Sequence, residues 1–167
     1  MSIVVNTDFK GEYNVSKNCY DQLDTYIEKY EKKYLRKLLG AELYDLFIAD
    51  LTVTDPQVPQ TQRFIDIFDE FAIDENNYCL IVSEGIRKML TQLIYFHYVR
   101  ENQVVNSATG TVSSSVELGA NASFKGNIVT AFNEGVENSH SIQWFICDNP
   151  TIYPEENIQI LRFTSGI

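Results

Sequence analysis

The sequence predicts a mainly α-helical protein, a small bundle of four to five helices with one long projecting loop and extended arms at both termini. Apolar residues recur at intervals of three and four over several long stretches, which is the spacing of an amphipathic helix. Glycine or proline stands where the main stretches end, as at helix termini. Hydrophobic residues make up 44% of the 167-residue chain, enough for one globular core. We therefore expect a single domain spanning residues 1–167.

The first helices are expected in residues 18–102, behind an irregular N-terminal arm of residues 1–17. In DQLDTYIEKYEKKYLRKLLG, six apolar or aromatic positions share one helical face: Leu23, Tyr26, Ile27, Tyr30, Tyr34 and Leu38. Gly40 is expected to end this helix, because glycine adopts the left-handed cap conformation without steric cost. A short second helix, AELYDLFIAD, then completes a helical hairpin with three inward residues: Leu43, Leu46 and Phe47.

Further helices complete the predicted bundle. A third helix is indicated by four apolar positions: Phe64, Ile67, Phe68 and Phe71. Residues 74–82 fit either a strand or the first turns of the next helix, which is clear over residues 83–102. That helix is apolar almost all round, which is typical of a central position in a core. The last helix is expected at residues 126–149, ahead of Pro150, and a C-terminal extension, residues 150–167, follows without helical periodicity.

The connection of residues 103–125 is much longer than the roughly four to six residues that usually join two elements. Small polar residues dominate it. From Thr111 to Leu118, apolar and polar positions alternate with the period of two that indicates a half-buried strand. Because the chain offers few other convincing strands, the loop fits either a strand whose partner lies in another subunit, by strand addition, or a hairpin. The alternative is a Ser/Gly loop with no role.

The charge distribution combines an acidic whole with one basic stretch. The net charge is −10 and the pI is about 4.6, which opposes non-specific attraction to DNA or to an anionic membrane. The first residues lack the pattern of a secretion signal and no run of about eighteen apolar residues occurs, so neither secretion nor membrane insertion is expected. Five of the thirteen basic residues fall within nine positions: Lys29, Lys32, Lys33, Arg36 and Lys37. They fit either a solvated helix face or a protein-docking stripe.

Catalytic and metal-binding motifs are not recognisable. The two histidines, His97 and His140, lack HExxH spacing, and no nucleophile elbow, phosphate-binding loop or dinucleotide fingerprint is present. We interpret His97, inside LIYFHYV, as a satisfied core histidine and His140 as an exposed helix residue. An acidic cluster lacks the order of a calcium-binding loop and is interpreted as a solvated face: Asp66, Asp69, Glu70, Asp74 and Glu75.

The three cysteines also indicate packing rather than chemistry. Cys19, Cys79 and Cys147 are odd in number and far apart, so we expect small buried hydrophobic side chains and no metal site. An enzymatic alternative would use Cys79 or Cys147 with a histidine, but no local signature accompanies either one. The protein is therefore expected not to be an enzyme and to need no cofactor.

Three stretches, in this order, resemble one known family. They are YIEKYEKKYLRKLLGAELYDLF, then SEGIRKMLTQLIYFHYVRENQ with the following ATGTV, and finally AFNEGVENSHSIQWFICDNPTIYPEE. Together they cover roughly residues 18–156 and are similar to the helical head-to-tail connector proteins, also called adaptor or neck-ring proteins, of tailed bacteriophages. The resemblance applies especially to those of podovirus-like phages that infect Bacteroides-type hosts. No single motif carries the resemblance, which depends on the ordered set.

The resemblance implies a structural virion subunit that is not an enzyme. It implies a dodecameric ring that docks to the portal protein, extends the DNA channel and meets the next neck or tail ring. DNA would pass through without specific binding, since an acidic channel repels phosphate, and no membrane is involved. The family's projection would correspond to residues 103–125 and its C-terminal extension to residues 151–167.

Candidate interface residues follow from sequence pattern within these regions. They are Lys29, Lys32, Lys33, Arg36, Thr111, Val112, Ser114, Val116, Leu118, Ile158, Ile160 and Phe163. The alternative function is a regulatory or binding module that uses the basic helix, residues 21–39, against nucleic acid or an acidic protein partner. A steep dependence of DNA affinity on salt would favour that alternative.

Overall fold

The computed structural model is mainly helical, as predicted, and describes residues 2–75, 79–102, 104–107, 110–113 and 118–155. Side chains are described in residues 2–73, 80–102 and 127–155. The described elements are, in order, α1 (Tyr20–Asp50), α2 (Gln62–Phe68), β1 (Phe71–Glu75), β2 (Cys79–Ser83), α3 (Gly85–Asn102), β3 (Val104–Ser107), β4 (Gly110–Ser113) and α4 (Leu118–Asp148). Within these residues, no helix is long and apolar enough to cross a membrane.

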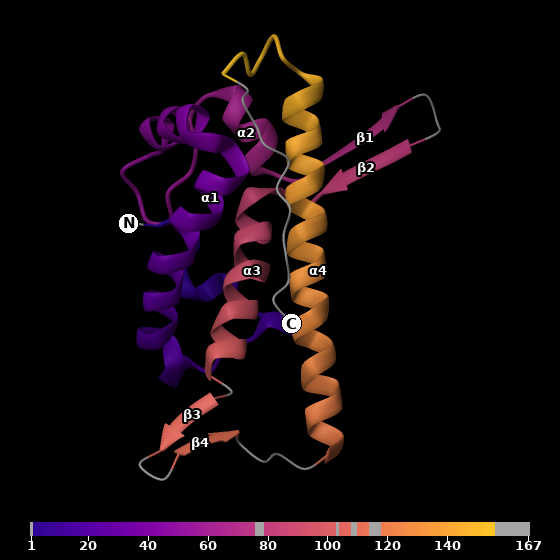
Figure 1. Cartoon of the computed structure of the whole chain (residues 1–167). Helices are drawn as coiled ribbons and strands as arrows, with labels where there is room; N and C mark the ends of the chain where they lie inside the picture. The colour runs from indigo at the N-terminus through magenta and orange to yellow at the C-terminus, as the bar shows by residue number, and fades with distance from the viewer. Residues whose placement is uncertain (1, 76–78, 103, 108–109, 114–117, 156–167) are drawn as a thin grey trace.

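Helix α3 lies at the centre of the bundle, with α1 on one side and α4 on the other (Figure 1). This confirms the central position predicted from its nearly all-round apolar surface. Eight of its apolar side chains are buried: Ile86, Met89, Leu90, Leu93, Ile94, Tyr95, Phe96 and Val99. Because α3 contacts α1, α2 and α4, the positions of the other helices all depend on it.

Helix α1 is kinked at Gly40, where φ is 72° and ψ is −176°. The predicted break at this glycine is therefore confirmed, although the two segments meet at a kink and not across the turn of a helical hairpin. Leu43 and Phe47 are buried as expected. Leu46 was wrongly assigned to the core, since it is 39% exposed, and Tyr44 takes an inward position instead.

The ambiguous stretch before α3 forms the second strand and part of the first strand of a β-hairpin. Strands β1 and β2 pair antiparallel, with Phe71 opposite Ser83 and Ala72 opposite Val82. Helix α2 ends at Phe68, so the assignment of Phe71 to a third helix was wrong. The Phe71 ring lies 5.0 Å from that of Phe145 on α4, which anchors the base of the hairpin, and the rest projects away from the bundle (Figure 1).

A second hairpin stands between α3 and α4, beyond the lower end of the bundle in Figure 1. The strand predicted from Thr111 onward is confirmed over β4, but its partner is β3 of the same chain, with Val105 opposite Val112. Strands β3 and β4 therefore form a hairpin, and a pairing with a strand of another subunit stays a prediction. Ser114 and Val116 lie outside the described residues. Leu118 begins α4, which starts eight residues before the predicted position.

The N-terminal segment is part of the core and does not extend as an arm. It forms three short 3-10 turns, at Asn6–Asp8, Gly11–Tyr13 and Lys17–Cys19. Five of its apolar side chains are buried: Ile3, Val4, Phe9, Tyr13 and Val15. The predicted end of the last helix is confirmed, because α4 stops at Asp148. The C-terminal candidate residues lie outside the described part of the chain: Ile158, Ile160 and Phe163.

Helices α3 and α4 approach each other closely at Gly135. A Cβ atom placed on Gly135 would lie 2.7 Å from Cγ of Leu93, much closer than two carbon atoms normally come. Leu93 itself is completely buried. The absence of a side chain at Gly135 therefore allows Leu93 to fill the space between the two helices.

We predict strong coupling between these two positions. Gly135→Ala should lower the free energy of unfolding by about 1 to 3 kcal/mol through overpacking, and Leu93→Ala by about 2 to 5 kcal/mol through a cavity. The double variant should lose clearly less than the sum, because the shorter side chain makes room for the added methyl group. Urea unfolding measures these losses. Ile27→Ala, buried in α1, is the control: its loss in the free energy of unfolding should add to that of Gly135→Ala. If the losses of Leu93→Ala and Gly135→Ala add in the same way, the prediction is contradicted.

Candidate functional site

The basic stripe, defined as Lys29, Lys32, Lys33, Arg36 and Lys37, lies exposed along α1. Three of its members rest on aromatic rings. Lys29 Nζ is 4.7 Å and Lys33 Nζ 5.2 Å from the centre of the Tyr30 ring, and the Arg36 guanidinium is 5.0 Å from that of Tyr44. Such cation–π contacts hold long side chains in place without removing their charge from solvent. The stripe therefore presents ordered positive charge.

The aromatic rings beneath the stripe belong to the core. Tyr30 is 4% exposed and Tyr34 5% exposed, so neither ring can stack with a nucleic-acid base. Tyr30 donates a hydrogen bond to Glu101 at the end of α3, and Lys29 pairs with the same carboxylate at 3.4 Å. This arrangement disfavours single-stranded nucleic-acid binding by base stacking on this helix.

His97 lies between these tyrosines, as a satisfied core histidine should. Its ring stacks on that of Tyr30 with centroids 3.9 Å apart and planes 8° from parallel. Its Nε2 lies 2.6 Å from the Tyr34 hydroxyl. Burial and the nearby Lys33 lower the pKa of His97 from 6.5 to about 4, while burial raises the pKa of Tyr34 to about 12. At neutral pH the imidazole is therefore neutral and the phenol donates the hydrogen bond.

The lowered pKa of His97 predicts a loss of stability in mild acid. The unfolded chain takes up this proton near pH 6.5 and the folded chain only near pH 4, so the stabilisation is complete above the unfolded pKa and is lost as pH falls through this window. We expect His97→Gln to remove up to about 3 kcal/mol of the pH dependence between those values. Urea unfolding at a series of pH values measures it. His140→Gln, at an exposed position, is the control. The same slope of unfolding free energy against pH in the wild type and in both variants would contradict the prediction.

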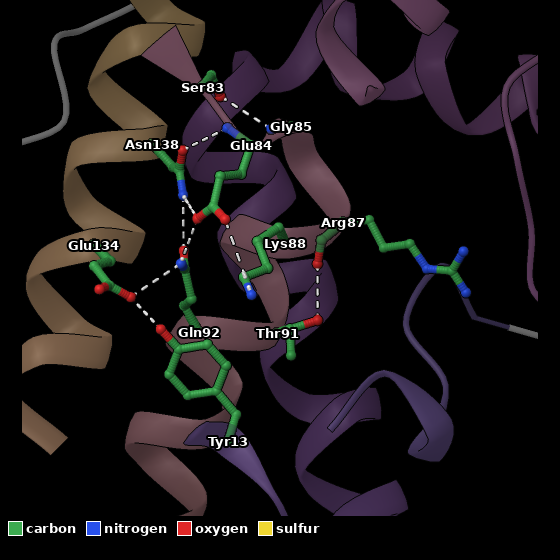
Figure 2. Close-up of polar contacts among 10 residues, drawn as sticks. All are labelled: Tyr13, Ser83, Glu84, Gly85, Arg87, Lys88, Thr91, Gln92, Glu134 and Asn138. Atoms are coloured by element: carbon green, nitrogen blue, oxygen red, sulfur yellow. Dashed lines mark hydrogen bonds and ion pairs between the residues drawn. The ribbon is translucent and has the colours of Figure 1, made fainter. Parts of the chain in front are cut away.

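A polar network connects α3, α4 and the N-terminal segment (Figure 2). Gln92, completely buried on α3, donates to Glu84 at 2.9 Å and to Glu134 at 3.3 Å. The side-chain amide of Asn138, on α4, donates to Oε1 of Gln92 at 2.8 Å and accepts from the backbone N–H of Glu84 at 2.8 Å. Tyr13 donates to Glu134, so one connected set of hydrogen bonds joins three parts of the chain.

A cavity of about 250 Å³ opens beside this network and is lined by charges of both signs. Lys10 and Lys88 face it together with Glu12, Glu84 and Glu134. Lys88 lies 4.0 Å from the Glu84 carboxylate, and Glu84 and Glu134 accept hydrogen bonds from Gln92. Within the described residues, no three histidine, cysteine or acidic side chains form a group that could hold a metal ion. Because two of its acidic side chains already bond to Gln92 and one of them pairs with Lys88, we interpret this region as structural.

The network should contribute to stability through Gln92. Gln92→Leu keeps the approximate volume but leaves Asn138 and two carboxylates short of a partner, so we expect a loss of about 1 to 3 kcal/mol in the free energy of unfolding. Thr91→Val is the matched control, since Thr91 is also buried on α3 and its hydroxyl donates, among the described residues, to a carbonyl oxygen of its own helix at 2.9 Å. Thermal or urea unfolding measures both. A loss at Gln92 no larger than that at Thr91 would show that the network is dispensable.

The outer face of the β1–β2 hairpin is a surface that sequence reasoning missed. We define it by Ala72, Leu80 and Val82, which lie on the side opposite Phe71 and Ser83 by the alternation of the strands. All three are exposed, with Leu80 at 66% and Val82 at 50%. The alternation of Leu80 and Val82 with Ile81 was a possible signal, but the stretch also fitted a helix start.

The predicted interface residues lie on α1, on β4 and at the first residue of α4, or outside the described residues. The basic stripe is exposed on α1, as either interpretation of it required. Thr111 and Val112 lie on β4, and Lys29, at the first end of the stripe, pairs with the end of α3 from which β3 departs. Cys147 is exposed and Cys19 half-buried, so the expectation of buried cysteines was wrong for Cys147. The side chain of Cys79 is outside the described residues.

Comparisons with protein-family models, with curated proteins and with solved structures find no significant match to this chain. The resemblance to phage connectors therefore remains a prediction from the sequence stretches quoted above.

Proposed function

We propose that this protein is a structural subunit of a phage neck ring, which docks to the portal protein, extends the DNA channel and links head to tail. The observation that carries the proposal is the pair of two-stranded hairpins that project from the helical bundle (Figure 1). An isolated two-stranded hairpin is marginally stable in water. Hairpins that project beyond a core are suited to contacts with other molecules.

The charges of the subunit support the same role. A ring of subunits that each carry a net charge of −10 would repel the DNA phosphates from its channel, so DNA would pass without adhering. The basic stripe provides the opposite charge locally, at a place where Tyr30 and Tyr44 hold the cations in position. In this proposal the oligomer is the dodecamer implied by the resemblance, and the protein is a component of the virion.

Electron microscopy of the protein mixed with the portal protein of the same phage tests the proposal. We expect a ring of this subunit on one end of the portal. A variant in which residues 104–113 become a Gly/Ser connection of equal length should keep its helical circular dichroism but bind the portal more than tenfold more weakly, because both strands of the second hairpin are lost. A wild-type protein that never decorates the portal, and instead binds DNA with a steep salt dependence, would overturn the proposal in favour of the binding module.

A further inference from the structure

We propose that the basic stripe of one copy docks on the outer face of the β1–β2 hairpin of a second copy, so that subunits join head to tail. The inference rests on the proposed ring and names the partner of the stripe. The proposed contact joins one surface of the first copy to a different surface of the second copy, so it is heterologous. Such contacts close into a ring when the rotation between neighbours permits and otherwise continue as a filament.

The two surfaces lie on opposite sides of the bundle. Helix α1 packs against α3 on one side, and β2 packs against α4 on the other; Figure 1 shows α1 at the left and the hairpin at the right. One subunit therefore cannot bring its own stripe to its own hairpin. When a second copy stands beside the hairpin of the first in the same orientation, the stripe of the second copy faces the hairpin of the first.

The hairpin has one covered face and one uncovered face. Phe71 packs on Phe145, and Ser83 is buried, so α4 covers the inner face at the base of the hairpin. The outer face leaves Leu80 and Val82 at 66% and 50% exposure. Burying such side chains is favourable in proportion to the apolar area removed from water, and the aliphatic stems of lysine and arginine are able to cover apolar surface while their charges stay solvated.

Charge complementarity identifies a second copy as the occupant. Asp69 and Glu70 are exposed where α2 leads into β1, and neither forms an ion pair with a described residue. Lys32 and Lys37 of the stripe are likewise exposed without an ion pair to a described residue. An apolar centre with opposite charges at its rim is the usual composition of a specific interface.

Two variants test the contact by complementation. The first, Lys32→Glu with Arg36→Glu, reverses the stripe and leaves the hairpin intact. The second, Leu80→Glu with Val82→Glu, disrupts the hairpin face and leaves the stripe intact. Light scattering after size exclusion at low salt should show wild-type oligomers, and each variant alone should self-associate more than tenfold more weakly. Their mixture should give a dimer that does not grow further, because only one intact pair of surfaces remains.

The control and the opposing outcomes make the test decisive. The control is Lys10→Glu with Lys17→Glu, at exposed positions of the N-terminal segment. It changes the net charge by the same amount as the reversal of the stripe and should associate like the wild type. A wild-type protein that stays monomeric at high concentration, variants that associate normally, or a mixture that yields no dimer would overturn the proposed contact. If either variant still forms normal rings on the portal, the neck-ring function stands and this interface is wrong; failure of the wild type to bind portal bears on the function instead.

Discussion

The close packing of α3 against α4 is the constraint on which the rest of the structure depends. Gly135 has no side chain where Leu93 of α3 fills the space between the helices, and the Gln92–Asn138 hydrogen bond at 2.8 Å fixes their relative position along the axis. Apolar contact alone allows one helix to slide slightly along the other. Two buried side-chain amides that hydrogen-bond to each other do not allow this, because the shift would leave them without partners. Since β2 leads into α3 and β3 follows it, the central helix also determines where both hairpins depart.

The N-terminal segment reinforces this arrangement by bonding to each long helix in turn. Glu31 of α1 accepts hydrogen bonds from the backbone N–H groups of Ile3 and Val4, both at 3.1 Å. Arg87 of α3 donates to Asp8 at 3.1 Å, and Tyr13 donates to Glu134 of α4. Burial raises the pKa of Glu31, so placing this carboxylate inside has a cost that the three N-terminal donors, including the Ser2 hydroxyl, offset. The segment predicted to be an irregular arm thereby becomes part of the core.

Much of the helical fold followed from the sequence, because amphipathic spacing and helix-ending residues are local signals. The break at Gly40, the central α3 and the end of α4 before Pro150 are of this kind. The hairpins were harder, since a short apolar run such as CLIVS fits a strand or a helix until its partner is known. The exposure of the basic stripe was predictable. Its cation–π contacts with buried tyrosines were not, because the tyrosines become buried only when α1 packs against α3. The Gln92 network joins residues more than forty positions apart, and nothing local indicates that.

The acidity of the chain limits how copies of it can meet. With 23 acidic and 13 basic residues, two subunits repel each other in most orientations, and this repulsion is weakest where the cations are concentrated. Five of those cations lie in the basic stripe, and beneath them His97 is kept neutral by burial and by Lys33 itself. The positive charge of this region is therefore confined to its outer surface, where it is available to a partner. A contact that used any other side of α1 would bring together surfaces with fewer cations, so in the proposed ring the electrostatic balance of the whole subunit selects the stripe as one half of the interface.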